Sequence, residues 1–272
     1  MRNPLTLTFS DFAQATLARR MVRPGTMTDY QRLLRYAAPR LGTLRVGAIR
    51  REHIQECLVD ASQQGLGPKS VRNLLDFVRS ILRDAGVHVA DSLRVKAPQP
   101  GIRPLGQEEC SRLRAQLERS PDGDALLALL GTGLRRGELL ALCSADWHPD
   151  SCQVSVTKST GGPTKSGGAR LVDVPDWLAS IMQRAAARGG RLFTTAPRTL
   201  GRQLERACRA AGVPRVRVHD LRHSRITQLL LQGVPPLYVC QQAGHHSPAF
   251  TMSTYGHLVA ASPRQRREWC NA

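Results

Sequence analysis

The sequence predicts a mainly α protein with a small antiparallel β-sheet, divided into a helical N-terminal domain and a larger second domain. Over residues 5 to about 93, apolar residues recur at helical spacing and no convincing strand is found. The segment VKAPQPGIRP at 95–104 then has the Pro and Gly content of a linker. Beyond it, apolar and polar residues alternate around Val154 and Val156, as in a β-strand. We therefore expect one domain over 1–94 and another over 105–272.

Helices are expected in the N-terminal domain at 9–21, 28–41, 50–63 and 68–85. The last is the clearest, because Pro68 stands near its start and an apolar stripe runs from Val71 to Leu82. Its polar face is basic and consists of Lys69, Arg72, Arg79 and Arg83. A basic helix face is often only a solvated surface, so the pattern alone leaves DNA contact and plain solvation equally open.

The second domain begins with helices expected at 107–119, 125–130 and 134–142. Two β-like runs at 152–157 and 171–174 flank STGGPTKSGGAR, which is rich in turn-forming residues. This pattern predicts a β-hairpin with a mobile tip. A helix at 176–187, a short strand at 191–193 and a helix at 199–211 follow.

The C-terminal stretch from His219 to Tyr255 places polar and ionisable groups at helix ends. Its first helix presents one face made of His219, Arg222 and His223. Gly233, Pro235 and Pro236 end that helix and open the next, which should stop at Gly244 and deliver His245. Ser247-Pro248 has the pattern of an N-cap followed by proline and starts a last helix carrying Tyr255. Convergence of such groups suits phosphate chemistry.

The charge balance points to a polyanionic partner. The formal net charge is +18, and only Lys69, Lys96, Lys158 and Lys165 among the 39 basic residues are lysine. Arginine binds phosphate through two parallel hydrogen bonds and stays charged, so nucleic acid is favoured. A coding bias could explain the ratio of Arg to Lys but not the net charge. Aromatic content of 4% argues against a binder of single strands that uses stacking platforms.

Compartment signals are consistent with a cytoplasmic, nucleoid-associated protein. The seven cysteines are scattered singly without a Cys-x-x-Cys pair, as expected of reduced thiols. The first residues lack the apolar region of a signal peptide, and no run of about 18 apolar residues could span a membrane.

Two boxes give the sequence a family resemblance. The upstream box is Thr132-Gly-Leu-Arg-Arg-Gly-Glu138. The downstream box consists of His219-Asp-Leu-Arg222, then Gly244-His245, then Tyr255. In this order and spacing they resemble the tyrosine recombinases, the family of phage integrases, Xer recombinases and integron integrases. The resemblance spans about residues 105 to 257. Departures are minor, such as Gly137 where serine is common.

The resemblance implies a helical core-binding domain that clamps DNA, through Lys69, Arg72, Arg79 and Arg83, and a catalytic domain. It also implies an enzyme that cuts and rejoins DNA through a 3′-phosphotyrosine and a Holliday junction, for integration, excision or resolution of a phage or mobile element. Tyr255 would be the nucleophile, with Arg135 and Arg222 neutralising the phosphate and His219 and His245 donating hydrogen bonds or moving protons. Lys165, on the hairpin tip, would protonate the departing 5′ oxygen. The expected partners are double-stranded DNA, further copies in a homotetramer on paired sites, and a directionality factor.

Several alternatives remain open at this point. Lys158 lies in the same hairpin and could be the general acid instead of Lys165. His219 and His223 have the spacing of zinc ligands, but no third ligand stands at a recognisable distance, so no metal and no cofactor are expected. His223 is expected to be structural or to support the site from behind, and Glu138 to orient its neighbours.

Two other functions compete with recombination. One is a DNA-relaxing enzyme resembling type IB topoisomerases, which shares the chemistry and would relax supercoils without sequence preference. The other is a non-catalytic DNA-binding regulator, whose signature would be the loss of one matched residue. All matched positions are occupied.

Overall fold

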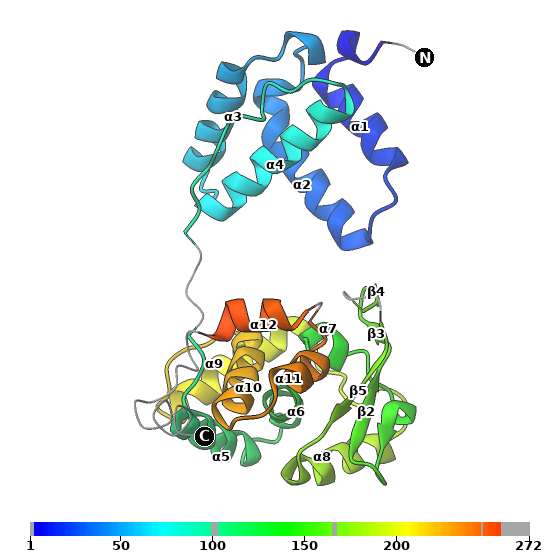
Figure 1. Cartoon of the computed structure of the whole chain (residues 1–272), viewed down its shortest axis with the longest axis vertical. Helices are drawn as coiled ribbons and strands as arrows, with labels where there is room; N and C mark the ends of the chain where they lie inside the picture. The colour runs from blue at the N-terminus through cyan, green and yellow to red at the C-terminus, as the bar shows by residue number, and fades with distance from the viewer. Residues whose placement is uncertain (1–2, 99–102, 165–167, 246, 257–272) are drawn as a thin grey trace, which may run out of the picture. The chain divides into compact units, whose positions relative to one another are not determined.

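The computed structural model describes residues 3–98, 103–164, 168–245 and 247–256. The chain divides into two compact units, Met1–Pro100 and Gly101–Ala272, each built on a hydrophobic core of its own (Figure 1). Helices dominate both units, and the described strands form small antiparallel sheets in the second. The predicted fold class is therefore confirmed.

The N-terminal unit is a helical bundle. Its elements are η1 (Pro4–Thr6), α1 (Phe9–Arg19), α2 (Pro24–Leu41), η2 (Val46–Ala48), α3 (Arg51–Gln63) and α4 (Pro68–Asp84). Helix α2 packs against α1, α3 and α4. The apolar stripe of α4 that runs from Val71 to Leu82 is buried against this core, as its helical spacing predicted.

Capping chemistry fixes where these helices begin. The Thr8 hydroxyl accepts a hydrogen bond from the backbone N–H of Asp11 at 3.2 Å and caps α1. Pro24 and Pro68 stand in the first turns of α2 and α4, where the N–H that proline lacks has no intrahelical partner in any case. The prediction that the second helix begins at residue 28 was wrong, because proline opens this helix at Pro24 instead of preceding it.

The second unit combines helices with a three-stranded sheet and a separate two-stranded sheet, whose residues are largely exposed. Its helices are α5 (Gln107–Glu118), α6 (Asp124–Thr132), α7 (Arg136–Leu139), η3 (Ser144–Asp146), α8 (Asp176–Ala187), α9 (Pro197–Ala210), α10 (Val218–Leu231), α11 (Pro236–Ala243) and α12 (Pro248–Tyr255). Its strands are β1 (Trp147–His148), β2 (Gln153–Val156), β3 (Lys158–Ser159), β4 (Gly162–Pro163) and β5 (Arg170–Asp173).

The predicted hairpin is present as the antiparallel pair β2–β5, with Val154 opposite Val172. Strand β1 extends this sheet on the other side of β2 and was not predicted. Between β2 and β5 the chain forms the separate pair β3–β4. Helix α7 is also shorter than the predicted helix at 134–142.

The short strand predicted at 191–193 is wrong. Only Arg191 makes a β-bridge, to Cys143, and the next residue, Leu192, donates its N–H to the Leu142 carbonyl at 3.0 Å. Leu192 and Phe193 are buried, so their apolar character reflects packing in a loop and not a strand.

Helices α6 and α10 form the centre of the second unit and lie side by side (Figure 1). Residues Ala125 to Thr132 of α6 are all buried, so this helix is enclosed by protein on all sides. Helix α10 packs along it and also contacts α9 and α11. The second unit thus holds the N-terminal end of α10, which carries His219 and Arg222, on a rigid support.

Leu74→Ala tests the burial of the α4 stripe. Leu74 is fully buried, so the truncation should lower the free energy of unfolding of the N-terminal unit by about 2–5 kcal/mol. Arg72→Ala, on the exposed face of the same helix, is the matched control and should change it by less than about 0.5 kcal/mol. Urea unfolding followed by circular dichroism measures both. Equal effects of the two variants would contradict the described packing.

Candidate active site

Glu138 forms the centre of an ion-pair cluster between α7 and β5. Its carboxylate, in a side chain that is 1% exposed, pairs with Arg135 Nη1 and with Arg170 Nη2, each at 2.8 Å. It also accepts the backbone N–H of Arg135 at 3.0 Å, which caps α7. Burial raises the pKa of this carboxyl, but the hydrogen bonds and charges of Arg170 and Arg135 outweigh it and hold the pKa below its usual value. Glu138 is therefore ionised and fixes both guanidinium groups.

Arg135 and Arg222 meet at the turn that follows α11. Arg135 donates from Nη2 to the Gly244 carbonyl at 2.9 Å, and Arg222 donates from Nη2 to the Ala243 carbonyl at 2.6 Å. Arg222 also donates from Nη1 to the Gly133 carbonyl at 2.8 Å, so one guanidinium joins the ends of α6 and α11. Because Arg222 is buried and near Arg135, its pKa is lowered to about 10.

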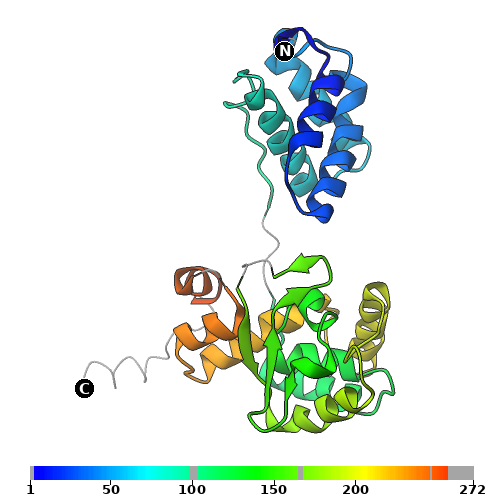
Figure 2. The ribbon, with the colours of Figure 1, turned by 90° about the vertical axis from the view of Figure 1, so that its right-hand side faces the viewer.

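Glycine is required at the turn itself. Gly244 has a φ of 64°, in the left-handed region that ends α11, as the sequence predicted. A Cβ atom here would lie 2.8 Å from the guanidinium of Arg170. Arg170 Nε donates to the Gln242 carbonyl at 3.1 Å, and β5 runs beside α11 (Figure 2). Arg170 thus holds the end of α11 against the sheet, where the carbonyls of Ala243 and Gly244 accept from Arg222 and Arg135.

His245 and Tyr255 lie beyond this turn with their rings nearly parallel, at 8° and a centroid distance of 6.2 Å. His245 Nδ1 is 2.8 Å from Thr251 Oγ1, a residue of α12, so the imidazole is fixed to the helix that carries the tyrosine. The Ser247 hydroxyl caps α12 by accepting the Phe250 N–H, as predicted for the Ser-Pro pair.

Tyr255 is 1% exposed and its hydroxyl lies 2.6 Å from Nδ1 of His223. Burial raises the pKa of the phenol to about 12, against the positive charges of Arg222 and Arg135. His219 stands one turn earlier on α10, and its ring meets that of His223 edge-on at a centroid distance of 4.8 Å. Desolvation, His223 and the two arginines lower the pKa of His219 to about 4, so this imidazole is neutral at pH 7.

The structure thus brings Arg135, His219, Arg222, His245 and Tyr255 together in the second unit. Lys165 lies outside the described residues. Lys158, on β3, is exposed, and its Nζ lies 3.9 Å from the Cys143 sulfur.

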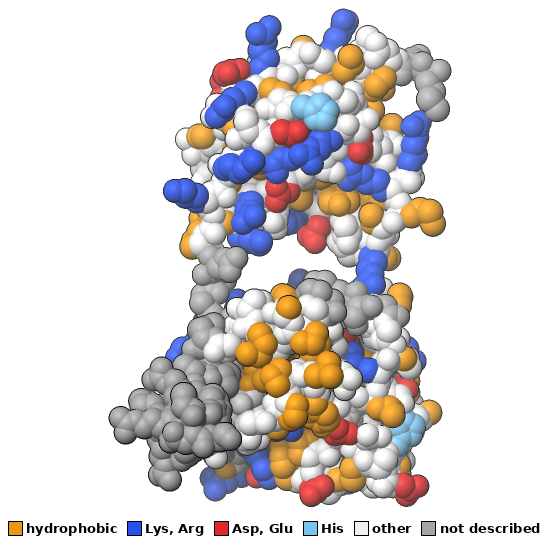
Figure 3. All heavy atoms as spheres, viewed as in Figure 1, with side chains coloured by type: hydrophobic (Ala, Val, Ile, Leu, Met, Phe, Trp, Pro, Cys, Tyr) orange, Lys and Arg blue, Asp and Glu red, His pale blue; other side chains and the backbone are white. Residues whose placement is uncertain are grey.

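The basic residues predicted on α4 belong to the N-terminal unit and differ in their surroundings. Lys69 and Arg72 are exposed. Arg79 is held by Asp76 at 2.6 Å and by the carbonyls of two residues beyond α4, and Arg83 donates to Asp91 at 2.9 Å. Arg79 is largely buried by these contacts, whereas Arg83 remains exposed although Asp91 pairs with it. Figure 3 shows Lys and Arg side chains spread over one face of this unit.

Arg170 was not predicted as a site residue, because no neighbouring motif marks it and it reaches Glu138 only when β5 pairs with β2. His223 was predicted to have a supporting role, without a partner. The spacing of His219 and His223 was a usable signal for a shared helix face, but the contact with Tyr255 depends on how α12 folds back.

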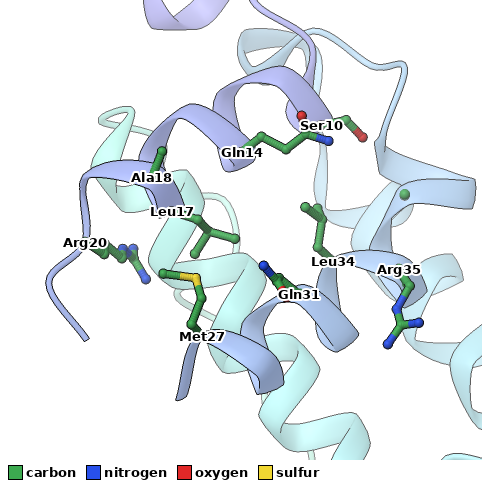
Figure 4. A pocket seen from close by; sticks show the side chains of 10 residues that line it. Ser10, Gln14, Leu17, Ala18, Arg20, Met27, Gln31, Leu34 and Arg35 are labelled. Atoms are coloured by element: carbon green, nitrogen blue, oxygen red, sulfur yellow. The ribbon is translucent and has the colours of Figure 1, made fainter. Parts of the chain in front are cut away.

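Surface hollows lie in both units. The lining of a cleft beside His219 includes Glu205 and five arginines, Arg136, Arg198, Arg202, Arg215 and Arg217. In the N-terminal unit, a groove between α1 and α2 is lined by Leu17, Met27 and Leu34 among others, and holds none of the predicted site residues (Figure 4).

Within the described part of the chain, no group of three or more His, Cys, Asp or Glu side chains is placed to hold a metal ion. No described helix is long and apolar enough to cross a membrane.

Comparisons with known proteins agree with this architecture. The sequence model of the phage integrase family matches residues 103–261. The tyrosine recombinase XerD of Caulobacter vibrioides is 32% identical, covering 76% of this chain and 77% of the relative. A XerC-like tyrosine recombinase of Caldanaerobacter subterraneus is 23% identical over 98% of this chain and 84% of the relative.

Solved structures share the fold over nearly the whole chain. The Tn1549 transposon integrase, in complex with a circular intermediate DNA, gives a TM-score of 0.83 at 18% identity, covering 97% of this chain and 99% of the other. A lambda integrase tetramer bound to a Holliday junction gives 0.76 at 16% identity, covering 94% and 78%.

Fold and family match define an enzyme that breaks and rejoins DNA. The chain belongs to the phage integrase family, the tyrosine recombinases, and acts as a site-specific DNA recombinase of the tyrosine type. The resemblance found in the sequence is confirmed.

Glu138→Gln should expose how far the cluster depends on one carboxylate. The neutral amide leaves Arg135 and Arg170 without their shared counter-charge, so the free energy of unfolding should fall by about 3 kcal/mol at pH 7. The folded-state pKa of Glu138 lies below its unfolded value, so its contribution is complete above the unfolded pKa and is lost as pH falls through the folded one.

The pH dependence supplies the control. Urea unfolding below about pH 4.3 should show the wild type losing stability more steeply than the Gln variant. Parallel curves for the two proteins would mean that Glu138 does not stabilise the fold through its charge.

Proposed function

We propose that Tyr255 attacks a DNA phosphodiester and forms a 3′-phosphotyrosyl link, with Arg135, Arg222, His219 and His245 around the scissile phosphate. The observation that carries the proposal is the meeting of two guanidinium groups at the Ala243–Gly244 turn, one residue before His245. Guanidinium groups bind phosphate oxygens through paired hydrogen bonds and neutralise charge that develops in the transition state. Tyr255 lies against His245, on the helix that this turn leads into.

In the proposed step, the Tyr255 oxygen forms a bond to phosphorus while the bond from phosphorus to the 5′ oxygen breaks. The phosphodiester energy is kept in the covalent link, so a 5′-hydroxyl can reverse the reaction on the same or another strand. His219 and His245 donate hydrogen bonds to the non-bridging oxygens. Lys165 gives the departing 5′ oxygen its proton, with Lys158 as the rival for this role.

The two units would divide the work of binding. We assign residues 1–94 to a DNA-clamping domain, 95–104 to a linker and 105–272 to the catalytic domain with its C-terminal tail. Lys69 and Arg72 are the strongest candidates for phosphate contacts in the clamp, because they are exposed, whereas Arg79 is largely buried and the exposed Arg83 is paired with Asp91. The arginine-lined cleft beside His219 would take phosphates that flank the scissile one.

The assembly proposed is a homotetramer on two paired DNA sites that passes through a Holliday junction, as in the solved lambda integrase complex. Movement of a mobile element is the proposed outcome, in line with the transposon integrase on its circular intermediate. Integration, excision and resolution use the same chemistry, and a directionality factor would choose between them. The protein would act on DNA in the cytoplasm.

Covalent capture tests the nucleophile. Wild type and Tyr255→Phe would be incubated in EDTA with nicked duplexes tiled across the DNA that flanks the gene, and denaturing gels scored for protein-linked DNA. A nick on the 3′ side of the cleavage point lets the short fragment that bears the new 5′-hydroxyl diffuse away, so the link accumulates. We expect an adduct on one tile with the wild type and none with Tyr255→Phe, which should still bind that tile.

Three results would contradict the proposal. They are an adduct with Tyr255→Phe, an adduct only when Mg²⁺ is supplied, and binding to a tile with no adduct from the wild type. The third result would support a regulator. Relaxation of supercoiled plasmid without sequence preference would instead support a topoisomerase-like activity.

Gly137→Val tests whether the hairpin must rest on α7 for leaving-group protonation. A Cβ at Gly137 would lie 2.5 Å from the Ser159 Oγ, and the Gly137 carbonyl accepts the Thr160 N–H at 3.0 Å. The larger side chain should push β3 away and displace the segment that leads to Lys165. Adduct formation should slow about 10- to 100-fold.

A substrate with sulfur in place of the bridging 5′ oxygen identifies the cause, because a thiolate leaves without needing a proton. This substrate should restore the rate of Gly137→Val. Gly161→Val, at a position where a Cβ would meet no atom within 4 Å, is the matched control and should cut both substrates at the wild-type rate. A slow reaction of Gly137→Val with both substrates would show that the defect is not in protonation.

A further inference from the structure

The tyrosine hydroxyl has one hydrogen-bond partner in the described part of the chain, and that partner is a histidine outside the family boxes. Nδ1 of His223 lies 2.6 Å from the Tyr255 oxygen, and the two rings are 5.6 Å apart between centroids. His223 follows Arg222 on α10, whereas Tyr255 ends α12. The contact therefore depends on the folding of α12 against α10.

Both groups are neutral near pH 7, so either nitrogen of the His223 ring can carry its proton. The pKa of Tyr255 is raised to about 12. Burial lowers the pKa of His223, and the charges of Arg222 and Arg217 lower it further, against Asp220. In the tautomer whose proton is on Nε2, Nδ1 accepts the hydrogen bond of the phenol.

We propose that His223 is a further catalytic residue, which takes the proton from the Tyr255 hydroxyl as this oxygen attacks the scissile phosphate. The proposal rests on the proposed role of Tyr255 as nucleophile. As the oxygen bonds to phosphorus, its proton passes to Nδ1 of His223 and the bond to the 5′ oxygen breaks. That oxygen is protonated by the general acid. In rejoining, the imidazolium of His223 returns the proton to the departing tyrosine oxygen.

The charges around the Tyr255 hydroxyl favour transfer of its proton to His223. A phenol with a raised pKa is a poor nucleophile until a base removes its proton, and a base must be within hydrogen-bond reach of that proton. The positive charges of Arg222 and Arg135 act on the same hydroxyl and stabilise the phenolate that forms. The hydroxyl thus lies between a base and two cations.

The other two histidines are placed for different tasks. His245 Nδ1 is engaged with Thr251 Oγ1, and the His245 ring lies nearly parallel to that of Tyr255. The ring of His219 meets that of His223 edge-on. His219 and His245 are therefore left to bind phosphate oxygens.

The test is the rate of covalent adduct formation by His223→Gln on the nicked duplex that the wild type cuts. Glutamine can accept the phenol hydrogen bond through its amide oxygen but cannot take the proton. We expect the rate at pH 7 to fall at least about 100-fold, with unchanged DNA binding and thermal unfolding. His223→Ala, which removes both functions, should be no faster.

The pH profile separates proton transfer from support of the fold. Because the pKa of His223 is lowered, the wild-type rate should fall only as the pH drops below the ordinary imidazole pKa of about 6.5, where the ring becomes charged and cannot accept a proton. His223→Gln should lose this acid limb, whereas His219→Gln, although slower, should keep it. An acid limb that persists in His223→Gln, or a His223→Gln rate equal to or above that of the wild type, would overturn the proposal.

A measurement on the wild type keeps the proposal testable if the variants do not fold. Nitrogen-15 NMR of the histidine side chains at pH 7 should show Nδ1 of His223 unprotonated and Nε2 protonated. A protonated Nδ1 would overturn the proposal, because such a nitrogen cannot accept the phenol proton. An adduct formed by Tyr255→Phe would refute the proposed nucleophile itself, which distinguishes that failure from a failure of His223 alone.

Discussion

The site depends on one buried carboxylate. Glu138 holds Arg135 from α7 and Arg170 from β5, and these arginines in turn bind the carbonyls of Gly244 and Gln242. A buried carboxylate is costly unless its charge is matched, so the fold is stable only when α7, β5 and the end of α11 come together. The same cluster therefore ties a helix, a strand and a turn that are far apart in sequence. The positions of the groups proposed to bind the scissile phosphate depend on this cluster.

Much of the fold could be predicted because local signals were strong. The stripe of α4, the end of α11 at Gly244 and the Ser247 cap each follow from residues within one or two turns. The boxes around Arg135 and Arg222 likewise carry their own spacing. Such features need no knowledge of distant contacts, because the residues that decide them are neighbours in the chain.

The rest could not be predicted because distant residues decide it. Leu192 and Phe193 are apolar because they pack on the core, and the same pattern in a short run suits a strand equally well. Arg170 resembles any other arginine of a basic chain until β5 pairs with β2 and brings it to Glu138. His223 gains its partner only when α12 returns to α10. The sequence places these residues on elements, and tertiary packing gives them their contacts.

The cluster carries an excess of positive charge, and this excess suits it to bind an anion. Arg135, Arg170 and Arg222 share one carboxylate, Glu138, and the lowered pKa of Arg222 reflects the cost of burying its charge beside Arg135. Backbone carbonyls satisfy the hydrogen bonds of Arg222 but supply no negative charge. An anion placed against these guanidinium groups would supply it, and a phosphorane, with more charge than the phosphodiester, would do so more strongly. The cost of this arrangement would thus be offset most fully in the transition state of the proposed reaction.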